Sequence, residues 1–167
     1  QILVEEGIAH PVLIGCAETI RATAEELHLD LDGVRIVEPA RFPRLQAYAE
    51  ELYRLRHRKG VTRREAAELI LDHNIFGSMM VHLDDADALI GGLTTHYPDT
   101  IRPALQVLAV RPGLRHVSGL YVLITRRGDM YFLADTTVNI EPSAEDLAEI
   151  AIVAAETAHR FDVEPRV

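Results

Sequence analysis

Residues 86–103 read Ala-Asp-Ala-Leu-Ile-Gly-Gly-Leu-Thr-Thr-His-Tyr-Pro-Asp-Thr-Ile-Arg-Pro, and this stretch predicts a strand, a turn and a helix start. The apolar residues 88–90 are typical of a short buried strand. Gly91 and Gly92 follow at once, and glycine lets backbone amides approach a ligand closely because it has no Cβ. A strand that leads through glycines into a helix is a unit of α/β proteins.

The second half of the stretch predicts an anion site at the start of a helix. Asp99 or Thr100 can cap the helix, and Pro103 then falls in its first turn, where a missing N–H costs little. The free amides of a helix start favour phosphate or carboxylate, and Arg102 lies beside them. The simpler interpretation is an ordinary turn with ordinary caps. The remaining polar residues of the turn either pack the loop or line a cleft as hydrogen-bonding groups: Thr95, His96 and Tyr97.

Short apolar strands and amphipathic helices alternate on the N-terminal side of this stretch, which predicts an α/β fold of layered αβα type. Strands are expected over 11–14 and 34–37. Thr62 and Glu65 have the spacing of a capping box, so a helix is expected to begin there. Other helices are expected over 17–29, from Pro43, over 74–83, and from Thr100 to about Arg111.

Beyond Gly113 the pattern changes to two strands joined by a tight turn, over 117–125 and 130–134, and then a helix capped by Ser143. We therefore predict two lobes, 1–113 and 114–167. The polar loop that follows the second strand is a possible cleft element, because ligands bind at the carboxyl ends of strands in open α/β sheets. A turn rich in side-chain-to-backbone hydrogen bonds is the alternative. The cleft candidates in this loop are Asp135, Thr136 and Asn139.

A second basic motif lies between two expected helices. Residues 54–62 read Arg-Leu-Arg-His-Arg-Lys-Gly-Val-Thr. Arg56 and Lys59 are candidates for binding phosphate, since arginine supplies a fork of donors and lysine a point charge. Solvated cations that offset a helix dipole are the alternative.

Composition limits the classes of partner. With 17 basic and 26 acidic residues, the net charge is −9, which argues against nucleic acid or an anionic membrane as the main partner. The single cysteine, Cys16, offers no internal disulfide and favours the cytoplasm. No metal is expected, because the histidines lack metal-ligand spacing. Both ends of the sequence resemble interrupted elements, so we expect an excerpt of a longer polypeptide.

The ordered motifs resemble the phosphate acetyl/butyryl transferase family over nearly the whole chain. The resemblance implies a two-lobed fold like that of isocitrate and isopropylmalate dehydrogenases, incomplete here, with the second lobe forming a dimer or higher homo-oligomer. It implies transfer of an acetyl group between coenzyme A and phosphate, with Arg56 and Arg102 binding substrate and a catalytic serine and aspartate beyond residue 167. The motifs are Arg56 to Thr62, Ala86 to Ala88 with Gly91-Gly92, Thr100 to Gln106, Arg111 to Gly113, and Ala134-Asp135 with Val138-Asn139.

Residues 95–100 and 134–139 resemble most the transferase-like C-terminal domain of hybrid NADP-dependent malic enzymes. That resemblance implies an oxidoreductase parent chain, with this domain binding acetyl-CoA as a regulatory ligand and mediating oligomerisation. NADP and a divalent metal are then expected only in the missing malic-enzyme region, and no cofactor in this fragment. His96 and Tyr97, in place of small residues, are expected to narrow the cleft. The alternatives are an active phosphate acetyltransferase and a purely structural dimerisation module.

Overall fold

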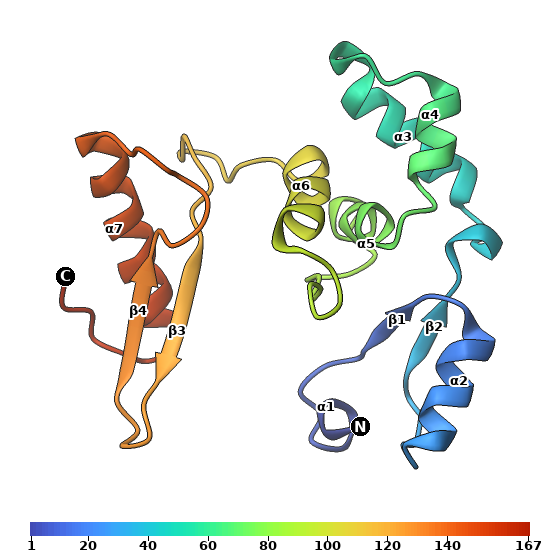
Figure 1. Ribbon diagram of the computed structural model, residues 1–167, viewed down its shortest axis with the longest axis horizontal. Coiled ribbons are helices and arrows are strands. Elements are labelled where there is room, and N and C mark those ends of the chain that lie inside the picture. Colours follow the sequence, from blue (N-terminus) through green and yellow to red (C-terminus); the bar gives the residue numbers. More distant parts are fainter. The chain divides into compact units, whose positions relative to one another are not determined.

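Two units make up the chain in the computed structural model, which describes residues 1–167: Gln1–Ala109 and Val110–Val167 (Figure 1). The division lies a few residues before the predicted lobe boundary at Gly113. The functional labels given to the two lobes stay predictions.

The first unit begins with α1 (Ile2–Glu5) and a parallel pair of short strands, β1 (Val12–Ile14) and β2 (Arg35–Val37). Helix α2 (Ala17–Glu26) lies in the crossover connection that joins them, which is the usual way to connect two parallel strands. The apolar runs predicted both strands.

Helices make up the rest of the first unit, and local caps set where two of them begin. The predicted capping box of Thr62 and Glu65 is present at the start of α4. Asp72 accepts hydrogen bonds from the backbone of Asn74 and Ile75 and so caps α5. The elements are the 3₁₀ turn η1 (Pro39–Arg41), α3 (Leu45–Arg56), the 3₁₀ turn η2 (His57–Lys59), α4 (Arg63–Leu69), α5 (His73–His82) and α6 (Tyr97–Val107).

The core of the first unit forms around three aromatic rings. Tyr48 of α3 and Phe76 of α5 are fully buried, and their rings stack at a centroid distance of 5.2 Å. Phe42 meets both rings edge to face, at 5.0 and 5.2 Å. Because α5 also packs against α6, this core fixes the helices that carry the predicted site residues (Figure 1).

The second unit is a hairpin covered on one face by a helix. β3 (Leu120–Ile124) pairs antiparallel with β4 (Met130–Ala134), and α7 (Ala144–Arg160) packs against β4. Ser143 and Asp146 form a capping box at the start of α7, which confirms the predicted cap.

The stretch around Gly91 differs from its prediction in two respects. Residues 88–90 form no strand: Leu89 lies against Gly77 of α5, where a Cβ would come within 2.6 Å of it, and Ile90 is 92% exposed. Helix α6 begins at Tyr97 rather than Thr100, because Pro98 has a backbone suited to a first turn. Pro103 consequently lies inside the helix.

None of the helices combines the length with the apolar character that crossing a bilayer requires.

Candidate anion-binding site

Three cations gather where α3 ends, and we call Arg56, Arg58 and Lys59 the α3 basic cluster. α3 ends at Arg56, η2 follows directly, and Gly60 ends that turn with a φ of 93°, in the left-handed region that glycine tolerates. Arg56 is half-buried, while the other two are exposed. The three cations therefore lie on the short turn between the end of α3 and Gly60.

The cluster lacks the carboxylate partners that its basic neighbours have. Arg54 binds Glu51 through two hydrogen bonds of 2.6 Å, and Arg64 pairs with Glu68 at 3.1 Å. The Arg54 guanidinium holds the pKa of Glu51 at about 2, against the opposing effect of burial. Arg63 pairs with Glu50 at 2.9 Å. No ion pair involves Arg56, Arg58 or Lys59, so their charge is available for an external anion.

The second set of predicted residues lies in the exposed turn before α6 and on its first turns. The hydroxyls of Thr95 and Thr100 share a hydrogen bond of 2.7 Å, which ties the turn to the helix. Arg102 points from α6 with 65% of its side chain exposed, and its Nη1 atom lies 3.9 Å from Asp99 Oδ1. An exposed contact of that length holds Arg102 weakly. Thr95 and His96 are exposed, and Tyr97 is 44% exposed.

The helix start offers fewer amides than the sequence predicts. The backbone N–H groups of Asp99 and Thr100 both donate to the carbonyl oxygen of His96, at 3.0 and 3.2 Å. Pro98 has no N–H to offer. The expectation of free amides at Thr100 is therefore wrong, because the helix begins three residues earlier and uses them internally.

Gly91 and Gly92 lie next to side chains of this protein, chiefly that of Thr100. A Cβ at Gly91 would come within 3.3 Å of Thr100 Cγ2 and 3.4 Å of Asn74 Oδ1. At Gly92, Thr100 Oγ1 would lie 3.5 Å away, and the φ of 99° is left-handed. Gly91 therefore has a packing role against α5 and α6, and Gly92 provides a left-handed backbone, in addition to the ligand role that the sequence suggests.

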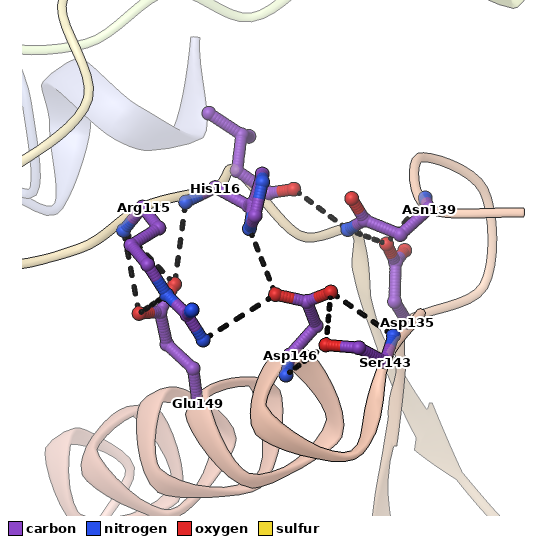
Figure 2. A network of polar contacts seen from close by, with 8 residues as sticks. Arg115, His116, Asp135, Asn139, Ser143, Asp146 and Glu149 are labelled. Atoms are coloured by element: carbon purple, nitrogen blue, oxygen red, sulfur yellow. Dashed lines mark hydrogen bonds and ion pairs between the residues drawn. The ribbon is translucent and has the colours of Figure 1, made fainter. Parts of the chain in front are cut away.

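Asp135, a predicted cleft residue, holds its own loop together (Figure 2). Its Oδ1 atom accepts the backbone N–H of Gly119, Thr137 and Val138, at 2.9, 3.0 and 3.2 Å. Burial acts to raise the pKa of Asp135, but these amides and that of Asn139 hold it at about 2. A carboxylate with this many internal donors has little capacity left for a ligand.

Asn139 is held in the same network, whereas Thr136 is exposed. Asn139 donates from its backbone and from its side chain to Asp135 Oδ2, at 2.8 and 2.6 Å, and its side chain also donates to the carbonyl of Val117 at 2.9 Å. Two of the three predicted cleft residues thus act within the loop. This arrangement matches the alternative interpretation of a turn stabilised by side-chain hydrogen bonds.

A neighbouring network was not predicted from the sequence. Glu149 of α7 accepts the backbone N–H groups of Arg115 and His116, at 3.1 and 3.2 Å (Figure 2). Asp146 pairs with His116 Nδ1 at 3.1 Å and with Arg115 at 3.4 Å. The acidic first turns of α7 thereby fix the segment that enters β3. Acidic residues at a helix start are so common that they gave no specific signal.

The chain has the mixed α/β fold of solved phosphotransacetylase structures. It superposes on a phosphotransacetylase from Streptococcus pyogenes with a TM-score of 0.89 and 32% identity, over 98% of this chain and 50% of that one. It also superposes on the EutD phosphotransacetylase from Staphylococcus aureus with a TM-score of 0.81 and 31% identity, over 93% of this chain and 46% of that one. The mixed α/β prediction is confirmed; the finer description as a layered, dehydrogenase-like two-lobed fold is not.

The whole chain, residues 1–167, matches the family model described as phosphate acetyl/butaryl transferase. It is 40% identical to the phosphate acetyltransferase of Synechocystis sp. over 167 residues, which are 99% of this chain and 24% of that protein. For the phosphate acetyltransferase of Bacillus subtilis the identity is 39%, over 96% of this chain and 49% of that protein. The chain belongs to the phosphate acetyl/butyryl transferase family and spans between a quarter and a half of these relatives.

These comparisons correct the malic-enzyme prediction. The similar proteins are named phosphate acetyltransferases, and none of those above is a malic enzyme. The oxidoreductase and NADP assignments, which depended on that prediction, are not supported. The residues that suggested it lie at 95–100 and 134–139, and of these Tyr97 and Pro98 form the first turn of α6.

Proposed function

We propose that the protein is a phosphate acetyltransferase, which moves an acetyl group between coenzyme A and inorganic phosphate. In this reaction the C–S bond of acetyl-CoA breaks, a C–O bond to phosphate forms, and the coenzyme A sulfur leaves as a thiol or thiolate. Family membership supports the reaction class. The observation that carries the site is the α3 basic cluster, whose three cations lack carboxylate partners in a protein of net charge −9.

Arg56, Lys59 and Arg102 are assigned to binding the phosphate group. Arginine presents paired N–H donors that fit two phosphate oxygens, and it keeps its charge at any working pH. Such donors also stabilise the charge that develops on phosphate oxygens and on the carbonyl oxygen during acyl transfer. Arg56 and Arg102 belong to α3 and α6, two helices that contact each other. Their action on one ligand is part of the proposal.

Arg56→Ala and Arg102→Ala are each expected to lower kcat/KM for acetyl phosphate formation by about 10- to 100-fold, since each removes a charge-assisted contact. Acetyl-CoA and phosphate are supplied to the full-length protein, and release of the free thiol is followed. Arg64→Ala is the matched control, because Arg64 is 89% exposed and pairs with Glu68 within α4. Its rate should stay within twofold of the wild type. No turnover by the wild type, or full activity of a variant that carries both Arg56→Ala and Arg102→Ala, would contradict the proposal.

We also propose that the second unit mediates a homo-oligomer. The strand register places Tyr121, Leu123, Tyr131 and Leu133 on one face of the hairpin, each about half exposed. An apolar patch of this kind is typical of an interaction site. In light scattering, Leu123→Asp should shift the protein toward monomer. Leu29→Asp, at a 47% exposed leucine of the first unit, should not. A monomeric wild type at micromolar concentration would refute the proposal.

A further inference from the structure

A groove of about 630 Å³ in the first unit is lined by four arginines that lie outside the candidate anion-binding site. Arg21 comes from α2, Arg35 from β2, Arg41 from η1, and Arg44 from the start of α3. All four are exposed. Residue 21 and the segment 35–44 thus contribute four guanidinium groups to the same groove.

Two of these guanidinium groups make no direct ion pair within the protein, although the charge of one of them, Arg35, acts on Asp85 at longer range. Arg41 pairs with Glu38 at 3.1 Å, and Arg44 pairs with Asp85. No ion pair involves Arg21 or Arg35. Glu38 is the only carboxylate among the lining residues, so the groove is strongly positive in a protein whose net charge is −9. An anionic ligand that enters it meets donors that are not already neutralised.

The rest of the groove is fixed by internal contacts. The Arg44 guanidinium lies 5.7 Å from the ring centre of Phe42 and 5.5 Å from that of Tyr48, and Asp85 accepts hydrogen bonds from both Arg44 and Tyr48. Glu38 Oε1 accepts the backbone N–H of Ala17 at 2.7 Å. That carboxylate occupies the start of α2, so recognition of an anion falls to the arginines.

We propose that this groove binds the phosphate groups of a nucleotide. Its volume lies within the range of small-molecule sites, and arginine is the side chain best suited to phosphate. Ile36, Phe42 and Pro43 add apolar surface against which a base or ribose can lie. Two sources share this chemistry: a free nucleotide such as ATP, and the nucleotide end of coenzyme A. The site is distinct from the one under the proposed function, since Arg56 and Arg102 do not line the groove.

Isothermal titration of the full-length protein with ATP, and separately with coenzyme A, tests the proposal. Arg21→Gln with Arg35→Gln removes the two cations that form no direct ion pair, and Asp85 keeps its ion pair with Arg44. We expect the double variant to lose at least tenfold in affinity for one ligand or both. Arg64→Gln with Arg63→Gln, on α4 outside the groove, is the control of equal charge and should bind as the wild type does. Thermal melting without ligand should show both double variants folded.

Comparing the two ligands distinguishes a site for a free nucleotide from a site for the nucleotide end of coenzyme A. If ATP binding weakens and coenzyme A binding does not, the groove accepts a free nucleotide. If coenzyme A binding weakens, the groove holds its nucleotide end, whether or not ATP also binds. The proposal is overturned if the wild type binds neither ligand, or if the Arg21/Arg35 double variant binds both within twofold of the wild type. Arg56→Ala should leave ATP binding unchanged. A wrong proposal for the groove and a wrong proposal for the transferase site therefore give different results.

Discussion

Phe76→Ala is expected to lower the free energy of unfolding of the first unit by about 3–5 kcal/mol, the usual cost of truncating a fully buried aromatic residue. Phe76 has no exposed surface, and its ring meets those of Phe42 and Tyr48 at 5.2 Å each. The substitution removes one of three rings that all contact one another, and it leaves a cavity that the helices around it can close only in part. Because α5 packs against α6, the helix that carries Arg102 should loosen as well.

Urea denaturation followed by circular dichroism measures this loss, and hydrogen exchange of the α5 amides assigns it to the first unit. Phe161→Ala is the matched control: Phe161 is 51% exposed in the second unit and meets Phe132 at 5.6 Å, so its loss should cost less than about 1 kcal/mol. Phe76→Leu keeps most of the buried volume and should fall between the two. A cost below 1 kcal/mol for Phe76→Ala would show that the three rings are not the centre of the core.

The predictions that held were those decided by interactions within a few residues. The capping boxes at Thr62 and Ser143 depend on a side chain and a backbone group three residues apart, and both formed as the spacing indicated. The strands over 12–14 and 35–37 were recognisable because each is short, mostly apolar and close to Gly and Pro residues on both sides.

The predictions that failed were those decided by competition between neighbours or by packing. Both Pro98 and Asp99 suit a position at the start of a helix. The structure shows that the helix begins at Tyr97, with Pro98 in its first turn. Residues 88–90 have an apolar strand pattern, yet Leu89 lies against Gly77 of α5. The fit of one side chain against a glycine twelve positions away in a folded helix has no local sequence signature.

The candidate site was predictable in its residue types and less so in its geometry. Arg56 and Arg102 were selected by motif, and the structure adds that Arg56 has no carboxylate partner while Arg54 has one. The arginine groove was not foreseen, because Arg21 and Arg35 come together only through the parallel pairing of β1 with β2 and the helix between them. Tertiary contacts create that site, and no spacing rule describes it.

Asp135→Asn is expected to lower the free energy of unfolding of the second unit by about 2 kcal/mol at neutral pH, because the amide cannot keep the charge that four backbone N–H groups stabilise. The pKa of Asp135 falls from 3.8 to about 2 on folding. A depressed folded-state pKa contributes stability above the unfolded value, and that contribution is lost as the pH falls. The difference between wild type and variant should therefore be constant above about pH 5 and should shrink between about pH 4 and pH 2.

Hydrogen exchange of the β3 and β4 amides across this pH range measures the effect within the second unit. Glu51 also has a pKa of about 2, but it belongs to the first unit and does not contribute to this measurement. Asp146 also has a lowered pKa in this unit, owing first to its hydrogen bond from Ser143, and it destabilises wild type and variant equally as it protonates. The matched control is Asp129→Asn in the exposed turn between β3 and β4, where the carboxylate accepts only the Thr125 hydroxyl at 3.2 Å. Its cost should stay below about 1 kcal/mol. Equal losses at positions 129 and 135, or a difference that persists unchanged at pH 2, would mean that the charge on Asp135 does not hold this loop.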